Sequence, residues 1–353
     1  AYLWGQYHEA VGEYSQAQAA IERARVACRH QADVVSEARC LAQLGLISRK
    51  QGEYERAKAW YNQALELLRG EGAYPEAETQ ALNGLGTIYR QQGNYDGART
   101  CYQRALALSR TSGNRVDEAQ ALNNLGVTAF YQRHLAEAMS YYRQALDVRR
   151  AIGDRAGEGA SLFDLGVALC ECGDYSQSQE YFLEALAIQQ ATGNRWEEAN
   201  VLNSMGILYL LLGELSTAQD YLQQGLELSR KTGDEAIQAY LLCNLGQVRR
   251  DQGDLVAAEE LLTDSLALAQ AQADRQLVSI CLSHLSLVSL QAGRLEQALE
   301  RANAALTPRR EMGLRLWTTI DLTTLAQAHW LSGDMDKALD YARQALAILD
   351  ECG

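Results

Sequence analysis

The sequence contains no long apolar run, although nearly half of its residues are apolar. Apolar side chains make up 47% of the 353 residues, and proline occurs only twice. No window approaches the roughly 18 to 20 uninterrupted apolar residues that a membrane span requires. We therefore expect a soluble protein without a membrane partner. The chain also has no signal peptide and no initiator methionine, which favours a fragment of a larger protein.

Positive charge is scarce. The chain has 32 Lys and Arg residues against 45 Asp and Glu residues, which gives a formal net charge of −13. Binding to a phosphate backbone depends on clustered Lys and Arg. We therefore expect no nucleic-acid partner, and a helical-repeat RNA reader is the least favoured class.

The cysteines and histidines lack the spacings that are typical of disulfide scaffolds, metal sites and catalytic sites. The eight cysteines show no framework spacing, which argues against a disulfide scaffold and favours the reducing cytoplasm. Cys170 and Cys172 stand two apart in a helical stretch, and no neighbouring Cys or His completes a metal set. The five histidines have no local Cys, Asp or Ser partner, and no GxxxxGK[ST] loop occurs. We predict no enzyme activity, no cofactor and no metal.

What the sequence does contain is a repeat. Glycine recurs every 40 residues or so, and Ser286 and Ala326 continue the same series. A period of 20 to 50 residues is typical of stacked-repeat proteins. The glycines of this series are Gly5, Gly45, Gly86, Gly126, Gly166, Gly206 and Gly246. Two further glycine series share the period, one seven residues later and one that ends with Gly353.

The apolar pattern of each repeat predicts two amphipathic helices. In residues 115–154, apolar side chains recur every three or four residues from Ala119 to Ala129 and again from Leu135 to Val148. Glycine followed by Asp, Asn or Glu separates the two helices, as in Gly173-Asp174, because glycine ends one helix in the left-handed conformation and the polar residue caps the next. Short turns of this kind predict antiparallel helix hairpins.

The order Leu122, Leu125-Gly126, Ala138, Tyr142, Ala145 resembles the tetratricopeptide repeat (TPR), with leucine where that motif often has tryptophan. The 40-residue unit is similar to the subclass in LGN/Pins adaptors, kinesin light chains and the sensor arms of bacterial STAND-type regulators. The resemblance implies an all-α fold, a right-handed superhelical α-solenoid of about nine hairpins. The expected units of this single solenoid are 1–33 (truncated), 34–74, 75–114, 115–154, 155–194, 195–234, 235–274, 275–314 and 315–353.

Three departures from the pattern carry expectations of their own. The unit 34–74 has one extra residue near Gly70-Glu71-Gly72, and Pro75 is placed to begin the next helix. Pro308 falls inside an expected second helix, which should end early or kink there. Ser286 and Ala326 replace the small glycine, so the last two units should pack more loosely or at a different angle.

Asparagines stand two or three positions before the repeating glycine, on the first helices that line the concave face of such arrays. Asparagine offers a donor and an acceptor together, and in the families that this chain resembles a ladder of them holds the backbone of a bound peptide. The alternative is that they bond neighbouring helices or water. The ladder candidates are Asn83, Asn123, Asn124, Asn203 and Asn244.

Four and five positions after the glycine, the side chains change along the array. The middle units carry Phe130, Tyr131, Leu210 and Leu211, and Phe163 adds to this apolar set. Basic residues flank it at Arg49, Arg90 and Arg250. An apolar groove with basic ends predicts a partner with apolar anchors and acidic flanks, either helical or extended. The alternative is that some of these side chains are buried between hairpins.

These features favour a non-catalytic scaffold that binds a protein or peptide segment in its groove through the asparagine ladder and the apolar patch. In that interpretation the chain is the sensor or adaptor segment of a larger cytoplasmic signalling protein. The main alternative is a small-molecule or signal-peptide sensor arm of a bacterial regulator, which would transmit binding by a change in superhelix curvature.

Overall fold

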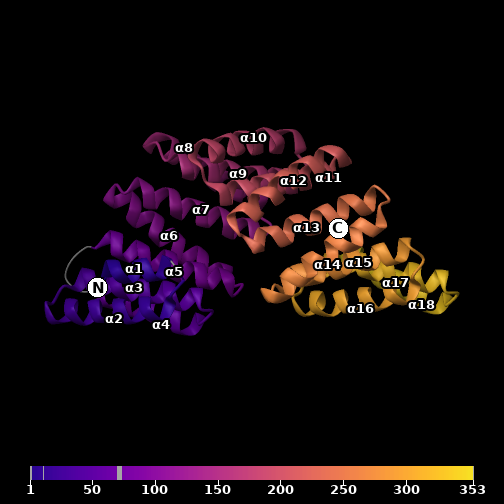
Figure 1. Cartoon of the computed structure of the whole chain (residues 1–353). Helices are drawn as coiled ribbons and strands as arrows, with labels where there is room; N and C mark the ends of the chain where they lie inside the picture. Colours follow the sequence, from indigo (N-terminus) through magenta and orange to yellow (C-terminus); the bar gives the residue numbers. More distant parts are fainter. Residues whose placement is uncertain (1, 11, 70–73, 353) are drawn as a thin grey trace. The chain divides into compact units, whose positions relative to one another are not determined.

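The computed structural model describes residues 2–10, 12–69 and 74–352. The regular structure of these residues is entirely α-helical and comprises 18 helices (Figure 1). Their bounds are α1 (Tyr2–Ala10), α2 (Tyr14–His30), α3 (Val34–Lys50), α4 (Tyr54–Leu67), α5 (Pro75–Gln91), α6 (Tyr95–Ser112), α7 (Arg115–Tyr131), α8 (Leu135–Ile152), α9 (Arg155–Glu171), α10 (Tyr175–Thr192), α11 (Arg195–Leu211), α12 (Leu215–Thr232), α13 (Glu235–Asp251), α14 (Leu255–Ala271), α15 (Arg275–Gln291), α16 (Leu295–Glu311), α17 (Arg315–Leu331) and α18 (Met335–Cys352).

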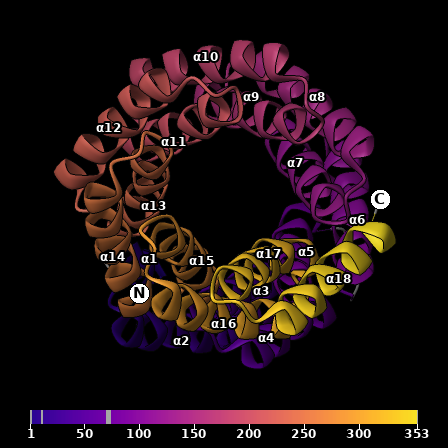
Figure 2. The same cartoon turned by 90° about the vertical axis from the view of Figure 1, so that its right-hand side faces the viewer.

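The chain divides into two compact units, Ala1–Ile188 and Gln189–Gly353, which we call the N-terminal unit and the C-terminal unit. In both, consecutive helices pack in pairs, such as α7 with α8 and α13 with α14. We call the odd-numbered helices first helices. Within each unit, several of them also contact the next first helix, such as α3 with α5 and α13 with α15. Figure 2 shows the result in the C-terminal unit, where α11, α13 and α15 form one layer and α12, α14 and α16 the other. Each unit is therefore a two-layered stack of hairpins, which confirms the predicted class of fold.

The predicted turn chemistry is present at the joints. Gly113 ends α6 with a φ of 73°, in the left-handed region that favours glycine. Asn114 then caps α7, because its side-chain oxygen accepts a hydrogen bond from the backbone N–H of Asp117 at 3.1 Å. Gly153 and Asp154 repeat the arrangement before α9. Pro75 begins α5, as expected. The extra residue near Gly70-Glu71-Gly72 and the last mark of the glycine series, Gly353, lie outside the described residues.

The repeating glycine is explained by the side chain opposite it in the same hairpin. A Cβ atom added to Gly126 would lie 2.5 Å from the ring of Tyr142, and one added to Gly86 would lie 2.7 Å from the ring of Tyr102. Real Cβ atoms do not approach other atoms so closely, so the aromatic ring occupies the space that a larger residue would need. Gly166 faces Phe182 in the same way.

In the hairpin of α15 and α16, the sizes of the two facing residues are reversed. Ser286 takes the place of the glycine, and Ala302 stands at the position that holds Tyr142 in its own repeat. Both Ser286 and Ala302 are completely buried, and the Ser286 hydroxyl donates to the carbonyl oxygen of Ser283 at 2.7 Å. A larger residue on the first helix is thus matched by a smaller one on the second, which keeps this hairpin closely packed and not loose.

The expectation that the helix around Pro308 ends early is wrong. Helix α16 continues through Pro308 to Glu311, and the carbonyl oxygen of Pro308 accepts a hydrogen bond from the N–H of Met312 at 3.0 Å. Proline lacks its own N–H donor and its ring crowds the carbonyl four residues earlier, but the hydrogen bonds of the following turn can still form. The next residue, Arg309, is buried and bonded to α15 and α17, which holds this last turn in place.

Candidate binding surface on the first helices

All predicted groove residues lie on first helices, but they are divided between the two units. The N-terminal unit holds Arg49 on α3, Asn83 and Arg90 on α5, Asn123, Asn124, Phe130 and Tyr131 on α7, and Phe163 on α9. The C-terminal unit holds Asn203, Leu210 and Leu211 on α11, and Asn244 and Arg250 on α13. We therefore describe two surfaces, one for each unit.

Three of the five asparagines are bonded within the repeat stack. Asn244 donates from Nδ2 to Oδ1 of Asn203 at 2.8 Å, which joins α13 to α11. Asn203 is buried, with 9% of its surface exposed. In the N-terminal unit, Oδ1 of Asn123 accepts a hydrogen bond at 3.0 Å from Arg149, a buried residue of α8. For these three side chains the structure has the helix-to-helix bonding that the sequence left open as the alternative.

The other two asparagines retain capacity for a partner. Asn124 is half-buried, and its Oδ1 accepts only a long 3.3 Å hydrogen bond from Gln120, on its own helix. Asn83 on α5 is also half-buried, and its Oδ1 is a buried acceptor that receives no hydrogen bond. An unpaired buried acceptor is costly, so a donor from a bound group would be favourable here.

Arg90, Phe130 and Tyr131 form a cluster that we call the aromatic cluster. Tyr131 stacks on Tyr95 with ring centroids 6.4 Å apart and an interplanar angle of 7°, and Phe130 meets it edge-on at 6.1 Å. The guanidinium of Arg90 lies 5.7 Å from the centroid of the Tyr131 ring. Tyr131 nevertheless keeps 55% of its surface exposed. The aromatic cluster therefore presents a braced, accessible ring at the end of α7.

The remaining apolar candidates differ in how accessible they are. Phe163 lies 5.9 Å from Phe182, its partner across the same hairpin, and is half-buried. In the C-terminal unit, Leu211 is 55% exposed whereas Leu210 is half-buried. Phe163 therefore contributes mainly to packing, and Leu211 is the accessible residue of the C-terminal set.

Of the basic candidates Arg250 and Arg49, only Arg250 is partly neutralised by a neighbour. Arg250 donates to Oδ1 of Asp251 at 2.7 Å and contacts Nδ1 of His284 at 2.9 Å. Arg49 is half-buried, and burial raises the pKa of the nearby Tyr61 to about 12, so the Tyr61 hydroxyl is uncharged and does not offset the guanidinium. The charge of Arg250 is therefore weaker toward a partner than the sequence indicated.

A polar cavity in the N-terminal unit was not anticipated from the sequence. It has a volume of about 460 Å³ and is lined by Tyr2, Arg39, Glu76, Gln80, Asn114 and Asp117. Arg39 pairs with Glu76 at 3.2 Å. Burial, reinforced by the charge of Glu76, raises the pKa of Asp117. The predicted binding residues all lie close to the repeating glycine. The residues of this cavity lie in the opening turns of the first helices, or just before them, at comparable positions in consecutive repeats.

His284 on α15 gives the C-terminal unit a dependence on pH. Burial, followed by the charges of Arg250 and Arg309, lowers the pKa of His284 to about 3, so the ring stays neutral in the folded chain. An unfolded histidine takes up a proton near pH 6.5. The contribution of neutral His284 to the free energy of unfolding is therefore fully present above pH 6.5. It is lost as the pH falls from 6.5 toward 3.

We expect acidification from pH 8 to pH 5 to cost the wild-type chain about 2 kcal/mol through His284 alone. His284→Gln should remove that part of the loss, because glutamine does not titrate. Urea unfolding of both chains at the two pH values measures the difference. Equal losses in the two chains would show that His284 makes no contribution.

Within the described ranges, no group of three or more His, Cys, Asp or Glu side chains is arranged to hold a metal ion. No helix in the same ranges is both long and apolar enough to cross a membrane.

Family models agree with the repeat geometry. Models of the tetratricopeptide repeat match residues 78–151, 158–231 and 236–311, and further models of the same repeat match residues 38–70 and 322–348. These matches cover well over half of the chain, so the chain belongs to the tetratricopeptide repeat family. A search of curated proteins finds no match to it.

Several solved structures share the fold. A Rap protein complexed with Competence and Sporulation Factor is 14% identical, with a TM-score of 0.71, covering 98% of this chain and 96% of that one. The apo form of the quorum sensor NprR from B. thuringiensis is 13% identical, with a TM-score of 0.67 and coverages of 97% and 99%. A STAND protein with a tetratricopeptide repeat sensor, from Pyrococcus horikoshii, is 14% identical, with a TM-score of 0.64 and coverages of 96% and 53%. At these identities the likeness establishes the fold.

Proposed function

We propose that this chain is a non-catalytic scaffold that binds a peptide or protein segment, as the sensor or adaptor part of a larger cytoplasmic signalling protein. The observation that carries the proposal is the aromatic cluster. An exposed tyrosine that is held by neighbouring rings loses little conformational freedom on binding, and such residues often dominate the energy of an interface. Accessible Tyr131 is therefore the principal contact in this proposal.

The structural neighbours support a binding role. One is described as a quorum sensor, another was solved in complex with Competence and Sporulation Factor, and a third carries its tetratricopeptide repeats as a sensor. A stack of hairpins with an accessible first-helix layer suits the same use here.

The side chains around the aromatic cluster indicate what a partner should contain. An apolar anchor would pack on Phe130 and Tyr131, and an acidic group beside it would meet the guanidinium of Arg90. Asn124 and Asn83 would bond the backbone of the same segment. In the C-terminal unit, Leu211 offers a place for another apolar anchor.

The polar cavity favours a second candidate function. Its volume of about 460 Å³ and its polar lining suit a small molecule or the end of a signal peptide. In this alternative the chain is the sensor arm of a bacterial regulator and transmits binding through a change in curvature.

Selection of random peptides on the immobilised chain, followed by affinity measurements, tests both candidates. For selected peptides, Tyr131→Ala should weaken binding by about tenfold or more. Asn124→Ala should cost about 1–3 kcal/mol if its hydrogen bond to the peptide is buried. Isothermal titration calorimetry measures both effects.

Two substitutions on second helices serve as matched controls. Tyr54→Ala on α4 removes another exposed tyrosine, and Asn303→Ala on α16 removes another exposed asparagine. Neither should alter the affinity. Peptides that bind Tyr131→Ala normally but lose affinity for Gln80→Ala, in the polar cavity, would refute the groove proposal and favour the sensor.

A further inference from the structure

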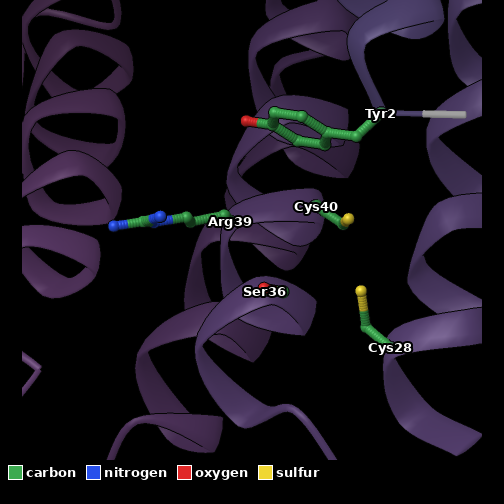
Figure 3. Close-up of a pocket in the computed structure, with 5 residues that line it drawn as sticks. All are labelled: Tyr2, Cys28, Ser36, Arg39 and Cys40. Atoms are coloured by element: carbon green, nitrogen blue, oxygen red, sulfur yellow. The ribbon is translucent and has the colours of Figure 1, made fainter. Parts of the chain in front are cut away.

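Two cysteines of the N-terminal unit face each other across a small cavity. Cys28 lies near the end of α2 and Cys40 in the first half of α3, and Figure 3 shows their sulfur atoms turned toward one another. The cavity has a volume of about 220 Å³ and is lined by Tyr2, Cys28, Ser36, Arg39 and Cys40. Cys28 is partly exposed, whereas Cys40 is buried. Both thiols line this cavity, one from each helix.

The repeat explains why these two side chains meet. Cys28 occupies the same position along its helix as Arg149 on α8, and Cys40 the same position as Ser161 on α9. Arg149 and Ser161 are in direct contact, with Nη1 of the arginine donating to Oγ of the serine at 2.6 Å. This position is thus a point where the second helix of one repeat touches the first helix of the next. At the first such joint the chain carries two thiols.

We propose that Cys28 and Cys40 form a redox-active dithiol site that reacts with a small-molecule disulfide and becomes an intramolecular disulfide between α2 and α3. This inference goes beyond the proposed function and is independent of it. The reaction has two exchange steps. The Cys28 thiolate attacks one sulfur of the small disulfide, whose S–S bond breaks and releases one thiolate. The sulfur of Cys40 then attacks the Cys28 sulfur of the mixed disulfide as Cys40 loses its proton, and the second small thiolate is expelled and takes up that proton.

The atoms and electrons of this reaction balance. The two cysteines lose two electrons and two protons, and the small disulfide takes up both to become two thiols. The order of the steps follows from accessibility, because Cys28 is partly exposed whereas Cys40 is buried. Burial raises the pKa of Cys40 to about 12, so Cys40 stays a protonated thiol until the second step, in which its proton passes to the expelled small thiolate.

The test uses the full chain and oxidised glutathione as the probe. After incubation, free thiols are alkylated and the digested peptides are mapped by mass spectrometry. We expect a peptide pair joined through Cys28 and Cys40. Cys172, an exposed cysteine directly after α9, serves as a control within the same chain. Its reaction should end at the mixed disulfide with glutathione.

Single variants separate the two steps. Cys40→Ser should accumulate glutathione on Cys28, and Cys28→Ser should leave Cys40 unmodified. Cys40→Ala replaces Cys40→Ser if circular dichroism shows that the serine variant does not fold. The peptide map of the wild-type chain alone shows whether the disulfide between Cys28 and Cys40 forms. A wild-type chain in which Cys172 is modified while Cys28 and Cys40 stay free, or in which Cys28 remains a mixed disulfide, would overturn the proposal.

Discussion

Asp321→Ala should lower the free energy of unfolding of the C-terminal unit by about 3–5 kcal/mol. Asp321 and Arg309 form an ion pair at 2.9 Å in which the side chains are 0% and 2% exposed. Arg309 also donates to the carbonyl oxygen of Trp317 at 2.8 Å, and Ser283 donates to Asp321 at 2.5 Å. Without the carboxylate, the guanidinium stays buried with no counter-charge, and this accounts for the large cost. Urea unfolding of the wild-type and variant chains gives the difference.

An exposed ion pair in the same unit provides the control for this experiment. Arg315 pairs with Glu351, and the two side chains are 60% and 58% exposed. Glu351→Ala should change the stability by less than about 1 kcal/mol, because water screens the pair. If Asp321→Ala cost no more than Glu351→Ala, the buried pair would not be holding α15, α16 and α17 together.

Tyr142→Ala should destabilise the N-terminal unit by about 3–5 kcal/mol, because it empties the space over Gly126. Tyr142 is 3% exposed and its ring fills that space. Gly126→Ser alone should cost about 1–3 kcal/mol, since the new side chain would collide with the same ring. Thermal and urea unfolding measure both effects.

The double variant Gly126→Ser with Tyr142→Ala copies the arrangement that the chain itself uses at Ser286 and Ala302. We expect it to be more stable than the sum of the two single effects predicts, by about 0.5–3 kcal/mol of coupling. Gly166→Ser with Tyr142→Ala is the matched control, because Gly166 faces Phe182 in the next hairpin. Additive effects in both pairs would mean that the glycine and the ring opposite it do not determine each other.

Local features of the fold were predictable because they depend on residues close in sequence. Gly113 and Asn114 end one helix and cap the next through bonds that span only a few residues. The position of Gly126 was recognisable because the repeat supplies several examples of the same slot. The early end expected at Pro308 was wrong for the complementary reason, since Arg309 is held by contacts with α15 and α17 that are distant in sequence.

The candidate site was predictable only in part. The sequence indicated which residues lie on first helices, and Tyr131 and Asn124 do have accessible surface or bonding capacity there. It could not show that Asn203 bonds Asn244, because two amides one repeat apart can each turn toward a neighbour or toward the groove. The polar cavity and the pair of thiols also arise from side chains in different repeats.

The sequence by itself determined that this chain is a set of tetratricopeptide hairpins, because helix periodicity, capping residues and small residues recur in the 40-residue units. Only the tertiary structure decided which side chains on those helices are free to bind a partner. Helix packing brings together Arg90 with Tyr131, Cys28 with Cys40 and Arg309 with Asp321. Such contacts depend on how neighbouring helices face each other. Side-chain rotamers and hydrogen bonds between repeats then determine whether a polar or aromatic group packs within the fold or stays accessible to a partner.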